Sequence, residues 1–553
     1  MFLVLLAVFT ATMVSQPDVF DGELEFQTTS ALAREQTLAL GGTPEADELV
    51  ARRFNMRAGG LGREDEWFSW FGVGQAFVGL PFYFAGTVLA DLLPEYELRH
   101  GEVEHAGVHR SEYFQHLLVG WRNPVLAAWT ALLIVLTTRR LGAGRRNAWI
   151  AGLTFGLCTF AWPQARSTLN MVQTTFFLFL AFHELLVIEE RLIRQRRPGL
   201  SRLALFGAAL GAAFLTRSLV APVLVVLGIA ALFVLCKGHP QRRVRTRAFD
   251  LLVVALPALA LLGLFLWTNR ARFGDPLEQG YGGVVTLESY FNYPLHLGLA
   301  GILLAPGQGL LWMAPACVFA LPWFVSLLRR GEFRTPLVVT GVAAGVLVPV
   351  CMTVGWHGAW GYGPRYALPL LPFLWLGVAP TLDRLGERKS LRPIAWALFG
   401  FGFLVTLPGV LVDTTTHTAM AVEVAQVQWP ELPGNEKTQE EERFQRIRWD
   451  LGFAAPWAHW RILRHRAAGL GEEFPIDSIF FATDARPEVL SGETTPLEVV
   501  RPPHDRDRGF RHFAWIDFSQ RLEGPLWPIA LLCTFLLLGG AVLVVKGLDP
   551  DRP

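Results

Sequence analysis

Long apolar stretches alternate with short polar segments along most of this 553-residue chain. Twelve of the stretches have the length of a membrane span, and they cover residues 1–16, 115–137, 147–162, 172–190, 202–216, 219–236, 249–268, 310–328, 336–355, 366–381, 391–412 and 526–545. A helix needs roughly 20 apolar residues to cross the hydrocarbon core of a bilayer, and tilt or burial changes that length. The pattern therefore predicts an all-α polytopic membrane protein with about twelve transmembrane helices.

Five clusters of Lys and Arg separate some of these stretches, at residues 139–146, 191–197, 237–247, 329–334 and 384–392. Cytoplasmic loops of membrane proteins collect Lys and Arg, so all five clusters are predicted to lie on the cytoplasmic side. Both ends of the chain fall on that side as well. The remaining polar segments, which hold the chemically reactive side chains, are predicted to face the extracytoplasmic side of the cell (inner) membrane.

One further apolar segment, residues 71–90, breaks this alternation. If it crossed the membrane completely, all five basic clusters would fall outside. It also contains residues that suit irregular backbone buried against protein, namely Gly72, Gly74, Gly79 and Pro81. We therefore expect an interfacial or re-entrant segment inside a long first extracytoplasmic loop, residues 17–114.

The pattern predicts three regions: a transmembrane catalytic region over 1–412, an extracytoplasmic region over 413–525, and a last helix with a cytoplasmic tail over 526–553. Residues 1–16 have no basic start and no clear small-x-small site, so we expect an uncleaved first span and not a signal peptide. The true N-terminus can lie upstream of this sequence.

Composition supports a multi-span membrane protein, because 52% of the residues are hydrophobic and only 18% are charged. The net charge of +1 and the interfacial position of the basic residues argue against a nucleic-acid partner. The cysteines and histidines lack the spacing of a metal site, and no nucleotide-binding loop or serine-esterase motif is present. We therefore predict no metal ligands; a divalent cation is compatible with the acidic loop described next but is not required.

Three extracytoplasmic segments hold candidate chemistry. The first is the acidic run from Asp18 to Glu25, which includes Asp21 and Glu23. Carboxylates at a membrane boundary can act as a general base or bind a divalent cation, although most such runs are simply solvated loops.

The second segment, residues 356–366, combines glycines with aromatic side chains and Arg365. It can approach a ligand closely, and Arg365 can hold a phosphate; the alternative is an aromatic belt with a snorkelling arginine. The third segment, residues 272–283, is predicted to form the wall of a cleft; the alternative is that its Gly and Pro residues only form structural turns. Arg122, Arg166 and Arg217 also fall near the outer boundary, where arginines mark a bound anion or anchor a helix end.

Several short motifs follow the acidic run along the chain: FGVGQ at 71–75, LPFY at 80–83, FGDPLE at 273–278, GY at 280–281, PGQGL at 306–310, GPRY at 363–366 and LP at 371–372. In this order they resemble bacterial membrane glycosyltransferases of the GT-C superfamily, the glycosyltransferase family 39-like group of protein O-mannosyltransferases and aminoarabinose transferases. The resemblance covers most of residues 15–380 and, weakly, 448–450.

The resemblance implies a GT-C-like fold and a polyprenyl-phosphate sugar donor bound from the outer leaflet. It implies that Asp21 is the catalytic base, with Glu23 as the neighbouring acidic position, and that transfer to an acceptor hydroxyl inverts the anomeric carbon. The donor phosphate is expected to contact arginines, in the order Arg365, Arg217 and Arg166. The expected substrate pocket consists of Glu278, Tyr281, His357, Trp360, Tyr362 and Tyr366.

Two positions depart from the group. Its members often carry an acidic residue where this chain reads RSTLNMVQ at 166–173, and an adjacent acidic pair where this chain has Asp21-Gly-Glu23. Metal dependence is therefore not predicted, and the acceptor stays open among protein, glycan and lipid. A transporter or flippase for a lipid or solute is the alternative function; it would be expected to show inverted repeats and charged groups near the bilayer midplane. A third possible function is that of a non-catalytic scaffold for envelope assembly.

Overall fold

The computed structural model describes residues 1–15, 20–40, 60–61, 66–96, 112–237, 243–280, 290–386, 389–434, 436–470, 474–475, 479–480, 499–500, 513–521 and 523–548. Most of these residues are helical. The helices before the extracytoplasmic region are α1 (Phe2–Ala11), α2 (Phe20–Arg34), α4 (Gly74–Leu92), α6 (Tyr113–Arg140), α7 (Arg145–Leu157), α8 (Ala161–Arg166), α9 (Met171–Ile193), α10 (Leu200–Thr216), η2 (Ser218–Val220), α11 (Ala221–Leu232), η3 (Phe233–Lys237), α12 (Val244–Phe273), α14 (Leu295–Leu304), α15 (Leu310–Met313), η4 (Pro315–Phe319), α16 (Ala320–Arg329), α17 (Arg334–Cys351), η5 (Val354–His357), η6 (Arg365–Leu370), α18 (Leu371–Trp375), α19 (Val378–Leu385), η7 (Lys389–Leu391) and α20 (Arg392–Leu411).

The remaining helices are α21 (Thr414–Gln428), α22 (Glu436–Trp449), η8 (Leu451–Phe453), α23 (Ala455–Ala467), α25 (Ala514–Arg521) and α26 (Trp527–Leu548). Two short antiparallel strand pairs complete the described chain. Strand β1 (Gly60–Leu61) pairs with β2 (Trp67–Phe68), and β3 (Phe474–Pro475) pairs with β4 (Val499–Val500).

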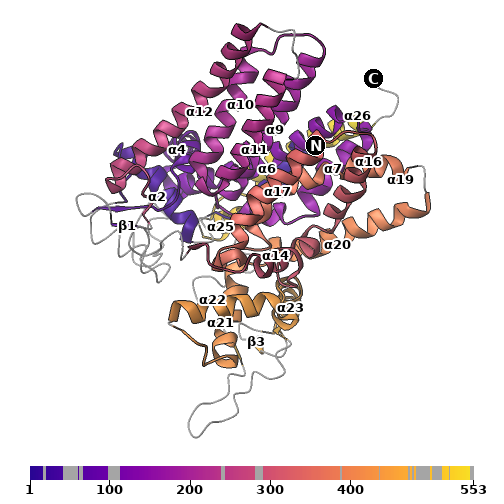
Figure 1. The fold of residues 1–553 in the computed structure, drawn as a ribbon. Coiled ribbons are helices and arrows are strands. Elements are labelled where there is room, and N and C mark those ends of the chain that lie inside the picture. Colours follow the sequence, from indigo (N-terminus) through magenta and orange to yellow (C-terminus); the bar gives the residue numbers. More distant parts are fainter. Residues whose placement is uncertain are drawn as a thin grey trace.

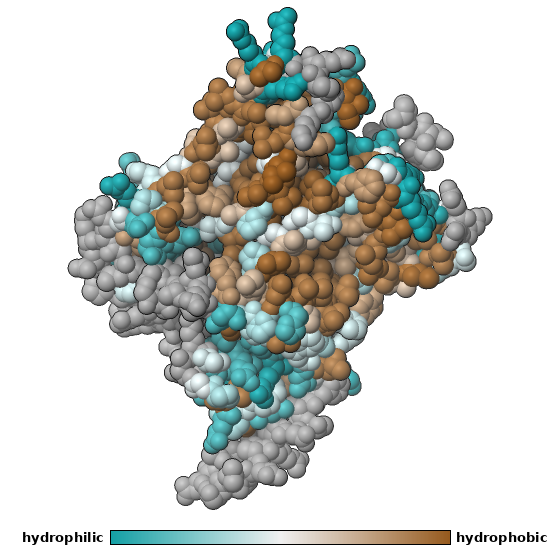
Figure 2. All heavy atoms as spheres, viewed as in Figure 1, coloured by the Kyte–Doolittle hydropathy of each residue, from teal (hydrophilic) through white to brown (hydrophobic). Residues whose placement is uncertain are grey.

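The predicted all-α polytopic architecture is confirmed. Seven described helices are long and apolar enough to cross a membrane, and a bent pair formed by η6–α18 and α19 makes up to eight. Five shorter apolar helices accompany them. Each of the twelve predicted stretches coincides with one or more helices, and a broad hydrophobic band lies between hydrophilic surfaces at the two ends (Figure 2). The number twelve itself stays a prediction.

The described residues of the five basic clusters lie at one end of the helix bundle. Four contacts link a residue of one cluster to a residue that lies close to another in the sequence: Arg140 with Glu190, Arg334 with Glu189, the Gly144 amide with Asp383, and the Arg334 guanidinium over the Phe233 ring. These contacts agree with the expectation that the clusters share a side of the membrane. That this side is cytoplasmic remains a prediction.

Helix α4, which contains most of the 71–90 segment, lies beside the first half of α6. A Cβ atom at Gly79 would come within 3.4 Å of the Arg122 guanidinium, and one at Gly86 would clash with Gln115. The start of α4 packs on Thr216, where α10 ends. All three contacts lie at the end opposite the basic clusters. The length of α4 would allow a crossing, so its interfacial or re-entrant placement stays a prediction.

Helices α21, α22 and α23 form a separate small unit below the bundle in Figure 1. They share a core of apolar side chains, which includes Val412, Met420, Ala421, Val424, Ala425, Ile447, Phe453, Ala458, Ile462, Leu463, Ile479 and Phe480. This unit is the part of the predicted 413–525 region that the structure describes most fully. The predicted domain boundaries stay predictions.

Candidate functional site

A cavity of about 640 Å³ opens at the end of the bundle away from the basic clusters. We call it the Asp21 cavity. Its walls come from α2, the segment before α4, the corner between α10 and η2, the loop after α12, and the start of η6. Of the residues predicted from the sequence, Asp21, Arg217, Glu278, Arg365 and Tyr366 line it.

Helix α2 supplies two carboxylates to this cavity. Asp21 lies in the first turn of the helix, where the helix dipole favours a negative charge. Glu25 follows four residues later, and side chains at that spacing lie on the same helix face. Both side chains line the cavity.

Asp21 and Arg365 form an ion pair, with 3.4 Å between Oδ2 of Asp21 and Nη1 of Arg365. Nη2 of Arg365 also donates a hydrogen bond of 3.1 Å to the hydroxyl of Tyr366. The Nε atom of Arg365 is buried and has no hydrogen-bond partner. A buried donor without a partner costs free energy. Arg365 can therefore gain from binding an additional anionic ligand.

Glycines in the 356–366 loop fit around the aliphatic part of Arg365. A Cβ atom at Gly358 would lie 2.9 Å from Cγ of Arg365, and one at Gly361 would lie 2.8 Å from Cδ. Gly358 also has a φ of +67°, a conformation that favours glycine. The glycines therefore allow the arginine to lie against the loop with its guanidinium directed at Asp21.

Arg217 brings a second guanidinium to the same wall. It follows α10 in an extended conformation (φ −152°, ψ 107°), at the turn that the sequence predicts after Thr216. The Arg217 guanidinium lies 4.7 Å from the centre of the Tyr366 ring, and that of Arg365 lies 4.9 Å from it. Cation–π contacts with one tyrosine thus hold two positive charges near each other.

Glu25 is a residue whose place in the cavity the sequence analysis missed. It is 1% exposed, accepts a 2.6 Å ion-paired hydrogen bond from Arg122, and has no hydrogen-bond partner for its Oε1 atom. Burial raises the pKa of Glu25 to about 8, against the opposing effect of the Arg122 charge. The spacing of four residues from Asp21 is the signal that would have found it.

Glu23 lies on another face of α2. Its carboxylate accepts a 2.7 Å hydrogen bond from Gln27 and lies 3.4 Å from Nε2 of His116. It is 2% exposed and does not appear among the residues that line the Asp21 cavity. The structure therefore brings Glu25, and not Glu23, together with Asp21, because two residues along a helix correspond to a rotation of about 200°.

Arg166 also lies apart from the Asp21 cavity. Its Nη1 donates to the backbone carbonyls of Gly409 and Val410, the latter at 2.5 Å, and its guanidinium lies 5.8 Å from the centre of the Phe513 ring. These contacts tie α8 to the end of α20. This placement gives no support to the predicted role of Arg166 in phosphate binding, which stays a prediction.

The aromatic residues predicted for the substrate pocket pack mostly against neighbouring elements. The Nε2 atom of His357 lies 2.8 Å from Glu441 of α22, and its ring stacks on Phe444. Burial lowers the pKa of His357, and the hydrogen bond with Glu441 acts against that shift. The ring of Trp360 also packs on Phe444. These contacts connect the loop before Arg365 to the α21–α23 unit.

Tyr362 donates a 2.5 Å hydrogen bond from its hydroxyl to the Val405 carbonyl and is buried. Glu278 lines the Asp21 cavity, but its Oε1 atom also accepts the backbone amides of Gln279 and Gly280, so it shapes its own turn. Tyr281 lies outside the described residues.

Arg272, at the end of α12, is a second residue whose role the sequence did not reveal. It is 1% exposed, and its Nη1 donates to the carbonyls of Ser69, at 2.5 Å, and Phe71, at 3.1 Å. It thereby fixes the segment that carries Trp70 and Phe71 to the cavity wall. Neighbouring Gly72 lies so close to the end of α10 that a Cβ there would be 2.5 Å from the Leu215 carbonyl.

Among the described residues, no group of three or more His, Cys, Asp or Glu side chains is placed to hold a metal ion. Asp21 and Glu25 are each partnered by an arginine.

No protein-family model and no curated protein matches the chain. Two crystal structures of ArnT from Cupriavidus metallidurans are similar to it. The structure bound to undecaprenyl phosphate is 15% identical with a TM-score of 0.37, over 86% of this chain and 72% of ArnT. The apo structure is 14% identical with a TM-score of 0.40, over 98% of this chain and 74% of ArnT. ArnT is an aminoarabinose transferase, from the group that the sequence motifs resemble; at these TM-scores the match carries no further argument about this chain.

Proposed function

We propose that this chain is an integral-membrane glycosyltransferase of the GT-C type, which moves a sugar from a polyprenyl-phosphate donor to an acceptor hydroxyl with inversion. The observation that carries the proposal is the pairing of Asp21 with Arg365 on one cavity wall, beside Arg217. A carboxylate base and two phosphate-binding cations are the groups that this reaction needs, and here they share one cavity.

In the proposed reaction the acceptor oxygen attacks the anomeric carbon while Asp21 takes the hydroxyl proton. The bond between that carbon and the phosphate oxygen breaks at the same time, and polyprenyl phosphate leaves with the electron pair. General-base assistance of this kind supplies about 10²–10⁴ in rate. Asp21 later releases its proton to water.

Arg365 and Arg217 would stabilise the negative charge that grows on the leaving phosphate. In the free protein Asp21 occupies one edge of the Arg365 guanidinium. A bound donor phosphate would replace Asp21 as the partner of Arg365, because guanidinium groups bind phosphate through paired hydrogen bonds. The exchange would free the Asp21 carboxylate to act as the base only when the donor is present.

The two sides of the cavity fit the two parts of such a donor. Asp21, Arg217 and Arg365 form its charged side. Phe265 of α12, a candidate membrane span, and Phe214 of α10, a shorter apolar helix, contribute apolar surface. A sugar phosphate would occupy the charged side, and the start of the prenyl chain would follow the apolar one. The acceptor stays open among protein, glycan and lipid.

We propose the inner membrane as the location and its extracytoplasmic side as the side of the reaction. The five basic clusters lie at the opposite end of the bundle from the Asp21 cavity, and loops rich in Lys and Arg normally face the cytoplasm. Cysteines introduced at Asp91 and at Arg330 would test this sidedness. An impermeant thiol reagent added to intact cells should label the first and not the second.

Purified protein incubated with candidate polyprenyl-phosphate sugars tests the reaction itself. The measurement is the release of free polyprenyl phosphate together with the glycosylated acceptor. We expect Asp21→Asn to lose at least about 10²-fold in transfer rate, whereas Asp91→Asn, an exposed carboxylate on α4, should keep the wild-type rate. Movement of a labelled polyprenyl phosphate across liposomes without sugar transfer would favour the alternative function, a lipid transporter or flippase.

A further inference from the structure

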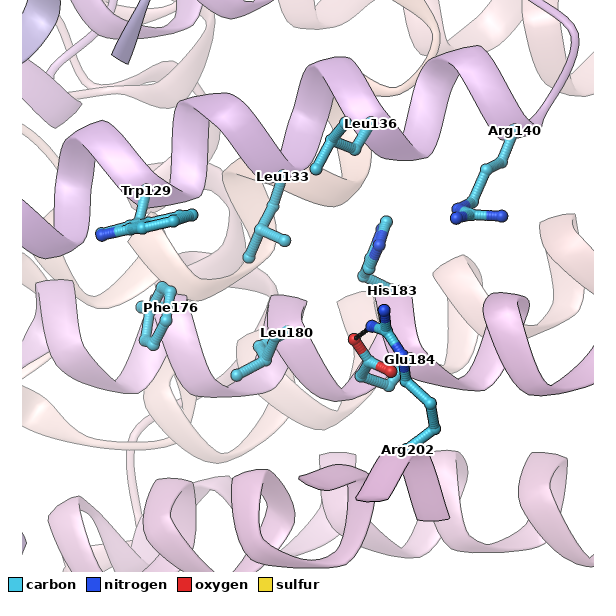
Figure 3. A pocket seen from close by; sticks show the side chains of 9 residues that line it. All are labelled: Trp129, Leu133, Leu136, Arg140, Phe176, Leu180, His183, Glu184 and Arg202. Carbon is cyan, nitrogen blue, oxygen red and sulfur yellow. Dashed lines mark hydrogen bonds and ion pairs between the residues drawn. The ribbon is translucent and has the colours of Figure 1, made fainter. Parts of the chain in front are cut away.

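A second cavity lies at the other end of the bundle, between α6, α9 and the start of α10. It has a volume of about 380 Å³. We call it the Glu184 groove, and Figure 3 shows the nine side chains that line it. It is separate from the Asp21 cavity: Arg202 at the start of α10 lines the groove, while Thr216 at the end of α10 lines the cavity, roughly 21 Å away along a helix axis.

One side of the groove is an apolar track. Trp129, Leu133 and Leu136 come from α6 at spacings of four and three residues, and Phe176 and Leu180 face them from α9 (Figure 3). Trp129 and Leu136 are 42% and 43% exposed, so the track opens to the surroundings of the bundle. Within a membrane these surroundings are lipid chains.

The other side of the groove is polar and charged. Arg140, His183, Glu184 and Arg202 come together there (Figure 3). Arg202 donates a 2.6 Å ion-paired hydrogen bond to Oε1 of Glu184. His183 is held in place by a 2.8 Å hydrogen bond between its Nδ1 atom and the hydroxyl of Thr137.

Glu184 has the capacity to accept a further hydrogen bond. It is 2% exposed, and its Oε2 atom is buried without a hydrogen-bond partner. A carboxylate inside a membrane helix is costly and usually has a functional reason. Its second oxygen requires a donor, which the described residues around it do not supply.

The arginines of this region outnumber its carboxylates. Arg140 pairs with Glu190, which also accepts an ion pair from Arg194, and Arg202 pairs with Glu184. Of the charged side chains that line the groove itself, two are positive, Arg140 and Arg202, and one is negative, Glu184. The groove therefore offers cations for a phosphate and an acceptor oxygen for a hydrogen-bond donor, both at the mouth of an apolar track.

We propose that the Glu184 groove binds a phospholipid whose head group carries a hydrogen-bond donor, either glycerol or ethanolamine. One acyl chain lies between Trp129 and Leu180, the phosphate contacts Arg140 and Arg202, and the head-group hydroxyl or ammonium donates to Oε2 of Glu184. The lipid belongs to the leaflet on the side of the basic clusters. The sugar-transfer proposal does not enter this argument, so either proposal can fail without the other.

Native mass spectrometry of the full-length protein in detergent tests the head group. The protein is incubated with phosphatidylglycerol, phosphatidylethanolamine or phosphatidylcholine of identical acyl chains. Phosphatidylcholine has the same phosphate and net charge as phosphatidylethanolamine but no head-group donor. A hydrogen bond to a charged group is worth about 1.5–3 kcal/mol, so we expect the first two lipids to be retained about tenfold more strongly. Equal retention of all three lipids would overturn the proposal.

Two pairs of variants test the position of the site. Leu180→Trp fills the track and should remove most of the bound lipid, while Leu259→Trp, at an exposed position on α12, should not. The double variant Glu184→Leu with Arg202→Leu removes the acceptor oxygen, leaves no buried charge unpaired and should abolish the preference for ethanolamine over choline. Arg330→Gln, an exposed arginine in another basic cluster, should keep it.

Unchanged binding in Leu180→Trp, or an unchanged preference in the double variant, would place the lipid elsewhere and refute the assignment. Glycerol phosphate provides the last arm of the experiment. If this soluble head group displaces the lipid at equal concentration, the apolar track plays no part and the proposal is wrong. If it does not, binding requires the acyl chain, as proposed.

Discussion

Asp21 and Arg365 are 344 positions apart in the sequence, yet their side chains form an ion pair of 3.4 Å at the wall of one cavity. The carboxylate comes from the first turn of α2, and the guanidinium from the first residue of η6. Two groups with opposite roles in the proposed sugar transfer therefore hold each other in the free protein. In the proposed reaction each exchanges its partner when a donor binds.

Replacing Gly358 with alanine should disturb Arg365 without touching its charge. The new Cβ would lie 2.9 Å from Cγ of Arg365, at a backbone φ of +67°. A misplacement of about 1 Å at a reacting group can cost up to about 10²-fold, so we expect the transfer rate at low donor concentration to fall roughly ten- to hundredfold. Gly355→Ala is the matched control, because a Cβ there meets nothing within 4 Å. Equal activity of the two variants would contradict the proposed role of the loop.

Replacing Arg272 with alanine should release the segment that carries Trp70 and Phe71. The carbonyls of Ser69 and Phe71 would lose their donor, at a cost of roughly 1–3 kcal/mol for each buried group left without a partner. We expect a lower melting temperature and a higher KM for the donor. Arg270→Ala removes an exposed arginine from the same helix and should change neither quantity. An unchanged melting temperature in Arg272→Ala would show that these hydrogen bonds do not stabilise the segment.

Glu25 should make the stability of the protein fall with rising pH. Its pKa is raised by burial from an ordinary 4.5 to about 8, so the folded state holds this proton more tightly than the unfolded state does. The corresponding stability is fully present below pH 4.5 and is lost as the pH rises toward 8.

Melting temperatures of the wild type and Glu25→Gln between pH 5 and pH 9 measure this contribution. The wild type should lose stability across the range relative to Glu25→Gln, which cannot ionise at this position. Glu35→Gln, which removes an exposed carboxylate at the end of α2, should follow the wild type. Parallel curves for wild type and Glu25→Gln would mean that Glu25 is already ionised in the folded protein.

The helical architecture could be predicted from the sequence because hydrophobic spans and basic clusters are long-range patterns of composition. The turn after Thr216 and the placement of Asp21 and Arg365 at the same end also followed from that pattern. Glu25 did not, because the polar pattern predicts a loop and not a helix in this part of residues 17–114. Residues 20–34 instead form α2, whose buried residues include several charged and hydroxyl side chains beside only two large apolar ones, Leu24 and Phe26.

Other parts of the site depend on contacts between distant segments, which no local pattern reports. Arg272 acts on carbonyls some 200 residues earlier in the chain. His357 looks like a ligand-binding residue in the sequence, but its partner Glu441 lies in the α21–α23 unit, whose fold the sequence did not predict. Tyr362 likewise has its hydroxyl partner in α20.

The binding of polyprenyl phosphate to Asp21→Asn and to Arg365→Gln, measured beside sugar transfer, tests the central claim most directly. Asp21→Asn should bind the lipid phosphate at least as tightly as the wild type, because Arg365 is released from its carboxylate, and should lose transfer. Arg365→Gln should lose binding and transfer together. Transfer by Asp21→Asn at the wild-type rate, or wild-type binding by Arg365→Gln, would contradict the account.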